Sequence, residues 1–160
     1  GGSLAEGVLA LKFGRRRELA RPLARRAYGE TGGLPAEGEL DLLLPVPLHR
    51  TRFLDRGFDQ ALLLAQELSR LSSVPVLIDG RRRLRPTAPQ GKRPDPKSRR
   101  ANVAGAFKAQ KPLQLKGKRV CLVDDVVTSG ATLNACAQAL RQARVAEIHA
   151  FALGRTLTDL

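Results

Sequence analysis

The pattern of apolar and polar positions predicts strands that alternate with helices along most of the chain. Short continuous apolar runs and one alternating run predict four strands, at 40–48, 74–78, 117–123 and 146–153. Apolar residues at helical spacing predict helices at 58–71 and 131–143. This alternation predicts an α/β fold, with a central, mostly parallel sheet flanked by helices.

The remaining segments predict two terminal helices and two connections. Apolar residues at helical spacing, with arginines between them, predict one or two amphipathic helices within 4–28, broken near Gly14 or Pro22. The residues of 31–39 are typical of a loop. Residues 81–100 are rich in Arg, Pro and Lys and predict a long exposed loop. Loops of that length in compact domains are usually functional or disordered.

Length and composition indicate an ordinary globular domain. The 160 residues suit one domain, with 42% apolar and 27% charged residues. No apolar run reaches the roughly 20 residues of a membrane span, so we expect none. The two cysteines, Cys121 and Cys136, form no Cys-x-x-Cys pair, so we expect no zinc site. Two buried free thiols are typical of a reducing, cytoplasmic location.

The positive charge is concentrated in one segment. Of the net charge of +13, the whole excess falls within 81–119, where 14 basic residues accompany a single acid, Asp95. A basic block of this kind indicates an anionic partner, either a phosphate-rich metabolite or a nucleic acid. The alternative interpretation is a solvated loop that only aids solubility.

The stretch 120–133, VCLVDDVVTSGATL, combines the residues most suited to binding chemistry. An apolar strand runs into Asp124 and Asp125, and a turn of hydroxyl-bearing and small residues leads into a helix that begins near Ala131. Ligands of open parallel sheets bind beyond the carboxyl ends of the strands, and a helix N-terminus attracts phosphate. Two carboxylates suit sugar hydroxyls or Mg²⁺. The stretch therefore predicts a site for a ribose 5-phosphate.

A purely structural interpretation of this stretch is that the two acids end a strand and Thr128 caps a helix. It accounts for one acid or one hydroxyl, but poorly for two adjacent acids that repel each other at a crowded sheet edge. The Gly-x-x-x-x-Gly-Lys-Ser/Thr and Gly-x-Gly-x-x-Gly patterns of nucleotide-binding loops are absent.

Four hydrophobic residues, two acids and the Thr-Ser-Gly-Ala-Thr turn resemble the ribose-5-phosphate/pyrophosphate motif of type I phosphoribosyltransferases. LLPVPLHRTRFLDRGFDQALLLAQEL, RRANVAGAF and ALKFGRRRELARPLA are similar to segments of the competence-associated ComF family. The resemblance extends from about Leu4 to Arg155 and implies a type I phosphoribosyltransferase fold over a single domain, 1–160. Many ComF proteins begin with a four-cysteine zinc module, and this chain has none.

The resemblance also implies roles for individual residues. Asp124 and Asp125 would hold the ribose hydroxyls of phosphoribosyl pyrophosphate (PRPP), as catalytic residues and as an indirect Mg²⁺ site. The 5-phosphate would be bound by Thr128, Ser129, Gly130, Ala131 and Thr132. Pyrophosphate would lie near Leu48, His49 and Arg50, and Arg99 and Arg100 could reach it from a hood formed by 81–100.

Two hypotheses from different classes remain open at this stage. The first is a phosphoribosyltransferase, a pentosyltransferase that uses PRPP, Mg²⁺ and an unidentified nitrogenous acceptor. The second is a non-catalytic protein of the same fold that acts in competence or DNA uptake and binds single-stranded DNA or protein partners. The basic segment favours the second, although 81–100 contains no aromatic residue on which bases could stack. The family also suggests a homodimer.

Overall fold

A computed structural model describes residues 4–13, 16–35, 38–47, 57–78, 81–83, 107–109 and 112–155. The helices are α1 (Leu4–Phe13), α2 (Ala20–Glu30), α4 (Gln60–Ser72), α6 (Pro112–Leu115) and α7 (Ala131–Gln142), and a short 3₁₀ turn, η1 (Arg17–Leu19), precedes α2. The strands are β1 (Leu42–Pro45), β2 (Arg81–Arg83), β3 (Phe107–Ala109), β4 (Arg119–Val127) and β5 (Glu147–Arg155). None of the helices in these ranges has the length and apolar character required to cross a bilayer.

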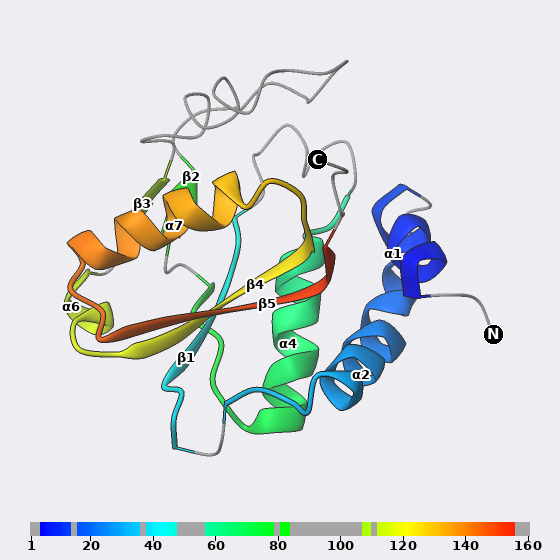
Figure 1. The fold of residues 1–160 in the computed structure, drawn as a ribbon, viewed down its shortest axis with the longest axis horizontal. Coiled ribbons are helices and arrows are strands. Elements are labelled where there is room, and N and C mark those ends of the chain that lie inside the picture. The colour runs from blue at the N-terminus through cyan, green and yellow to red at the C-terminus, as the bar shows by residue number, and fades with distance from the viewer. Residues whose placement is uncertain are drawn as a thin grey trace.

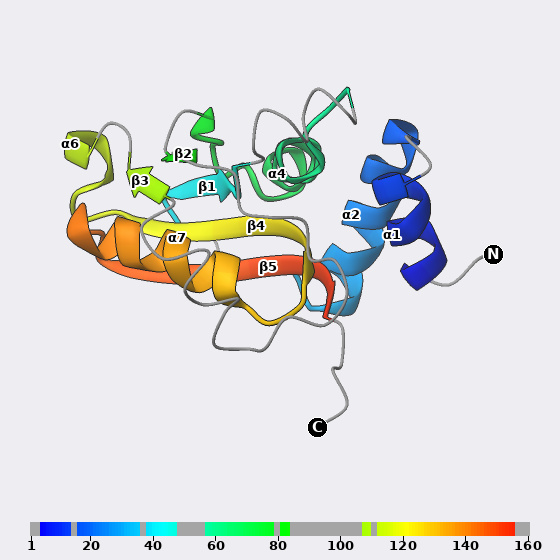
Figure 2. The same cartoon turned by 90° about the horizontal axis from the view of Figure 1, so that it is seen from above.

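A parallel three-stranded sheet, in the order β1-β4-β5, forms the centre of the fold (Figure 2). Its register pairs Leu43 with Cys121 on one side of β4, and Cys121 with His149 on the other. Each strand is followed by a helix or preceded by one, as the alternating pattern predicts. The parallel α/β fold predicted from the sequence is confirmed.

The strand predicted at 74–78 is not formed as such. Instead, a single parallel bridge joins Val76 to Leu43, with N–H donation from Leu43 to Pro75 O at 2.8 Å and from Leu77 to Leu43 O at 2.9 Å. Pro75 has no N–H to donate, which limits the ladder that this segment can build. The segment therefore lies beside β1 as an extended edge rather than a regular strand.

The core consists of two layers, one on each face of the sheet. Alternate residues of β4 enter different layers: Cys121 and Val123 pack with α1, α2 and α4, whereas Val120 and Leu122 pack with α7. Figure 1 shows α7 on one side of the strands and α1, α2 and α4 on the other. This explains why the apolar run at β4 is continuous, because a strand covered on both faces needs apolar residues at every position.

The two cysteines are buried and free, as predicted. Burial raises the pKa of the Cys121 thiol to about 12, so it stays protonated at neutral pH. Neither thiol is suited to act as a nucleophile in this state.

The N-terminal segment forms two helices that are separated before Pro22. Helix α1 ends at Phe13, and Pro22 lies in the first turn of α2, where a missing N–H removes no helical hydrogen bond. The break predicted near Gly14 agrees with the end of α1, and the alternative at Pro22 is wrong.

Strand β4 is longer than predicted, and this changes the position of the two acids. The sequence pattern ends the strand at Val123, but pairing with β5 continues to Val127, opposite Arg155. On the β1 side, the last bond is donated from Val46 N to Val123 O, at 2.8 Å. Asp124 and Asp125 therefore lie within β4, just beyond the point where β1 stops accompanying it.

At its opposite end, β4 is fastened to the residue that precedes β1. Arg119 donates from its backbone N and from Nε to Asp41 Oδ2, at 2.7 and 3.2 Å. The hydrogen bonds from Arg119 lower the pKa of the Asp41 carboxyl below its ordinary value. The end of the sheet opposite the hollow is therefore held by the ion pair and hydrogen bonds between Asp41 and Arg119.

Candidate functional site

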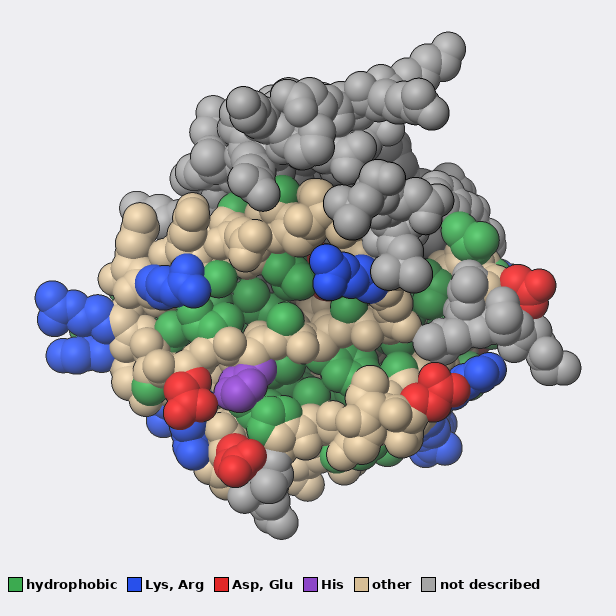
Figure 3. Space-filling model, in the orientation of Figure 1, with side chains coloured by type: hydrophobic (Ala, Val, Ile, Leu, Met, Phe, Trp, Pro, Cys, Tyr) green, Lys and Arg blue, Asp and Glu red, His purple; other side chains and the backbone are tan. Residues whose placement is uncertain are grey.

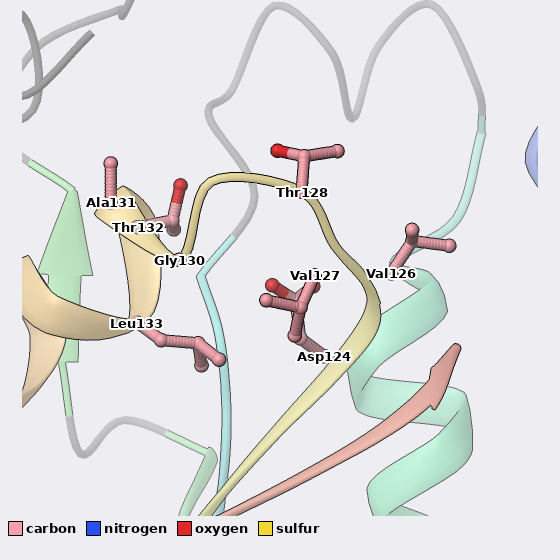
Figure 4. A pocket seen from close by; sticks show the side chains of 8 residues that line it. All are labelled: Asp124, Val126, Val127, Thr128, Gly130, Ala131, Thr132 and Leu133. Atoms are coloured by element: carbon pink, nitrogen blue, oxygen red, sulfur yellow. The ribbon is translucent and has the colours of Figure 1, made fainter. Parts of the chain in front are cut away.

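An open hollow lies where β4 turns into α7. It is lined by residues of the end of β4, the turn and the first turn of α7, namely Asp124, Val126, Val127, Thr128, Gly130, Ala131, Thr132 and Leu133. Figure 4 shows the chain curving around this space, with Asp124 on the strand side and Thr132 on the helix side. The hollow is at the carboxyl end of the central strand, where ligands of parallel sheets bind.

Gly130 gives the backbone a left-handed turn immediately before α7. This residue has φ 71° and ψ 0°, a left-handed conformation that glycine adopts at little cost. Its carbonyl accepts the first helical bond from Asn134 N at 2.9 Å. Gly130 has no side chain to cap the helix, and Ser129 Oγ accepts only a long bond of 3.4 Å from Ala131 N. The other N–H groups of the first turn and the positive end of the helix dipole suit an anion.

The hydroxyl groups of the turn are placed differently from one another. Thr128 and Thr132 line the hollow and are partly buried. Ser129 is exposed, does not line the hollow, and accepts a long hydrogen bond of 3.4 Å from Ala131 N. Two hydroxyl-bearing residues and the N-terminus of α7 therefore border the same space.

The two acids are each bonded to the backbone of the following residue. Asp124 Oδ1 accepts from Asp125 N at 2.9 Å, and Asp125 Oδ1 accepts from Val126 N at 2.8 Å. Both side chains are partly buried, but only Asp124 lines the hollow. A carboxylate such as that of Asp124 is the kind of acceptor that binds the hydroxyl groups of a sugar.

The structure brings together five of the seven residues predicted for the ribose and its phosphate: Asp124, Thr128, Gly130, Ala131 and Thr132. Asp125 and Ser129 lie beside this group. The residues predicted for pyrophosphate (Leu48, His49, Arg50, Arg99 and Arg100) lie outside the described residues, as does most of the hood. Their roles remain predictions.

The apolar part of the lining was missed by the sequence interpretation. Val126 packs against the core on the α4 side, and Val127 and Leu133 line the hollow. In Figure 4, Val126 points toward α4, away from Leu133. The sequence did contain a sign of this apolar lining, because the two valines after the acids continue the apolar pattern of the strand.

Within the described ranges, no three His, Cys, Asp or Glu side chains are grouped to hold a metal ion. Asp124 and Asp125 supply hard oxygen atoms that suit Mg²⁺, but a full octahedral set would need further oxygens, from a ligand or water. The indirect Mg²⁺ site remains a prediction.

Comparison with known proteins agrees with this geometry. Residues 55–157 match the family described as "Phosphoribosyl transferase domain". The chain is 37% identical over 152 residues to competence protein F of Haemophilus influenzae, covering 92% of this chain and 66% of that protein. It is 38% identical to the DNA utilization protein YhgH of Escherichia coli K12, over 92% of this chain and 65% of that protein. The chain thus spans about two thirds of the length of these relatives.

Solved structures show the same fold. Glutamine PRPP amidotransferase from B. subtilis has a TM-score of 0.52 at 22% identity, covering 87% of this chain and 26% of that one. A purine phosphoribosyltransferase from Pyrococcus horikoshii has a TM-score of 0.51 at 18% identity, covering 84% of this chain and 83% of that one. At such identities the likeness shows the fold alone, and it confirms the fold predicted from the motif.

Proposed function

The chain belongs to the phosphoribosyl transferase domain family, and we propose that its hollow binds the phosphorylated ribose of PRPP or of ribose 5-phosphate. The observation that carries this proposal is the convergence of Asp124, Thr128 and Thr132 with the uncapped start of α7 on one space. A phosphate fits the helix end, and a polyhydroxyl ring fits the carboxylate.

Each part of the ligand has a counterpart in the chain. We assign the 5-phosphate to the backbone N–H groups of Gly130 to Thr132 and to the hydroxyl groups of Thr128 and Thr132. Gly130 presents no Cβ to the phosphate, which allows close approach to the backbone. The ribose hydroxyls are assigned to Asp124, with Asp125 beside it. When bound, Mg²⁺ would neutralise charge on the pyrophosphate of PRPP.

The reaction that follows is transfer of the phosphoribosyl group to a nitrogenous acceptor. The bond from ribose C1 to the pyrophosphate oxygen breaks, a bond from C1 to the acceptor nitrogen forms, and the acceptor loses a proton. Asp124 would hold the ring in place while positive charge develops on it, and a nearby carboxylate stabilises such charge. No nucleophilic side chain is required, which fits the buried state of both cysteines.

Thermal unfolding with PRPP and Mg²⁺, with ribose 5-phosphate, and with ribose or inorganic phosphate alone would test the site. A ligand at about 100 times its Kd adds about 2.7 kcal/mol of stability. In a domain of this size, each 1 kcal/mol raises Tm by about 2–4 °C. We expect clear shifts with the two phosphorylated riboses and smaller shifts with each half alone.

Variants make the test specific to the hollow. Replacing both Thr128 and Thr132 by Val should reduce the Tm shift with ribose 5-phosphate, because the phosphate loses two hydroxyl donors. Asp124→Asn should also reduce this Tm shift, because the carboxylate that is assigned to the ribose hydroxyls is lost. Thr31→Val is the matched control, since the Thr31 hydroxyl donates to Ala27 O at 2.8 Å at the end of α2. A shift that survives in the double variant would place the ligand elsewhere and refute the proposal.

We propose, as a second candidate function, binding of a nucleic acid, which is favoured by the basic segment and by the similarity to a protein named for DNA utilization. The antiparallel register of β2 and β3 places Arg82 directly opposite Lys108. Two basic residues at opposed positions of a strand pair suit a phosphate backbone.

Fluorescence anisotropy with a labelled single-stranded oligonucleotide would test this second function. Affinity should fall steeply as salt rises, because phosphate contacts release counterions. Arg82→Glu reverses the charge at one of these two positions and should weaken binding. Equal affinity in this variant, or affinity independent of salt, would exclude the β2–β3 pair as the contact.

A further inference from the structure

Gln60 is the one polar residue that is buried among those that the structure describes. Its exposed fraction is 2%, whereas Figure 3 shows Lys, Arg, Asp and Glu side chains on the outside of the molecule. Its Nε2 has no hydrogen-bond partner within the described part of the chain. An unpaired donor of this kind lowers the stability of a folded protein and calls for an explanation. An apolar residue at this position would avoid that loss.

Helix α4 directs Gln60 toward the central sheet. Gln60, Leu64 and Leu68 are four positions apart and all buried, so they form one face of the helix. Leu64 and Leu68 pack in the core layer that contains Cys121 and Val123 of β4. Gln60 is therefore the residue of this face that is nearest the start of the helix.

Asp125 follows on the same face of β4. Cys121 and Val123 belong to this layer, and the side chains of a strand alternate between its two faces, so Asp125 is the next residue on the α4 side. The register of β4 and β5 places Asp125 beside Leu153, which packs in the same layer. Asp124 lies on the other face and lines the hollow.

The start of α4 and the end of β4 lie at the same edge of the sheet. After β1 the chain returns through α4 to an extended segment that runs parallel to β1, so α4 runs opposite to the strands. Four residues of helix before Leu64 advance about 6 Å, and two residues of strand beyond Val123 advance about 6.6 Å, so Gln60 and Asp125 reach the same level. In Figure 4, Val126 points toward the start of α4, in agreement with this placement.

We propose that Gln60 is a positioning residue for the ribose site, whose Nε2 donates to Asp125 Oδ2 when a phosphorylated ribose occupies the hollow. In the free chain, Asp125 Oδ1 accepts from Val126 N at 2.8 Å, and Gln60 Nε2 is unpaired within the described residues. The bond from Gln60 holds Asp125 in place beside Asp124. It also adds to the free energy of binding, because only the free chain has the unpaired donor. This inference rests on the function proposed for the hollow.

Calorimetric titration with ribose 5-phosphate and thermal unfolding of the free chain would test the proposal. Gln60→Met keeps the size of the side chain and removes the donor. The free variant should be more stable, with a Tm higher by about 2–4 °C, because it has no unpaired donor. Its Kd for ribose 5-phosphate should be about tenfold weaker, because a hydrogen bond to a carboxylate is lost. Loss of a purely structural residue would lower stability and affinity together.

A swap of the two side chains tests whether Gln60 acts through Asp125. Gln60→Glu places two carboxylates together and should weaken binding more than Gln60→Met does. In the double variant Gln60→Glu/Asp125→Asn, the amide at position 125 can donate to the carboxylate at position 60, so binding should be tighter than in Gln60→Glu alone. Two independent losses would instead add, and the double variant would bind more weakly.

The matched control is Gln66→Met, the same substitution at a half-buried position of α4 that does not line the hollow. It should leave the Kd unchanged. If the native chain does not bind ribose 5-phosphate, the proposed function fails and this inference fails with it. If the native chain binds, and Gln60→Met either binds equally well or is less stable than the native chain, only the role of Gln60 is overturned. A double variant that binds more weakly than Gln60→Glu has the same consequence.

Discussion

Two helices, α4 and α7, begin at the carboxyl edge of the central sheet, and they differ in how their first N–H groups are capped. The start of α4 is capped by Asp59, in an extended conformation, whose side chain accepts from Leu62 N at 3.1 Å. The start of α7 has Gly130 in a left-handed conformation, and Ser129 Oγ accepts only a long bond of 3.4 Å from Ala131 N. An aspartate therefore caps α4, whereas the first turn of α7 has no comparable cap among the described residues.

This difference fits the proposed division, in which the start of α4 contributes to stability and the start of α7 binds an anion. A capping aspartate contributes about 1 kcal/mol and also neutralises the positive helix end. A helix without a capping aspartate is less stable on its own, but its first N–H groups can still attract an anion. The residues that line the hollow beside Gly130, including Thr128 and Thr132, are consistent with the second use.

The largest effect is expected from Gly130→Ala. Left-handed backbone costs a residue with a side chain roughly 1–2 kcal/mol, so the free energy of unfolding should fall by about that amount. The added Cβ would meet only Asn134 Nδ2, at 4.0 Å, so the cost is conformational rather than steric. The shift of Tm by ribose 5-phosphate should also be reduced.

Gly130→Asn is the control for this variant, because asparagine adopts the left-handed conformation more readily than alanine. It should lose less stability in chemical denaturation. If Gly130→Ala were as stable as the native chain, the left-handed start of α7 would not be required, and the comparison of the two helices would fail.

The next effect is expected from Asp59→Ala. Loss of the cap should lower the free energy of unfolding by about 1 kcal/mol, measured by chemical denaturation. The Tm shift produced by ribose 5-phosphate should remain, because this helix start is assigned to stability. Asp59→Ser, which can still cap, should retain most of the stability, and loss of the ligand shift in Asp59→Ala would contradict the division between the two helices.

The smallest effect is expected from Ser129→Ala. The Ser129 hydroxyl is exposed and its bond from Ala131 N is long, at 3.4 Å, so stability should change by less than about 0.5 kcal/mol. Since this removes a competitor for one N–H of α7, the ligand shift should be equal or slightly larger. A marked loss of the shift would instead show that Ser129 binds the ligand, as the family resemblance implies.

Much of the fold follows from local sequence features. The 3.6-residue pattern predicted the helix of α4 from residue 58, two positions before it begins at Gln60, and the small residues of the turn placed the start of α7 near Ala131. These elements depend on neighbouring residues, so a sequence pattern can detect them. The order of acids and hydroxyls was sufficient to predict the family.

Non-local contacts decided the rest. The sequence pattern could not show that β4 continues to Val127, because its last residues are held by β5, nor that the segment at Val76 forms only one bridge. It also treated Asp124 and Asp125 as equivalent, whereas only Asp124 lines the hollow.

By itself, then, the sequence determined the alternation of the main strands and helices, the glycine that starts α7 and the chemistry available beside it. The tertiary structure decided where β1 stops accompanying β4 and which of the two acids lines the hollow. The physical reason is that caps and periodicity act between residues a few positions apart. Strand pairing joins residues far apart in the chain, and its extent depends on every partner at once.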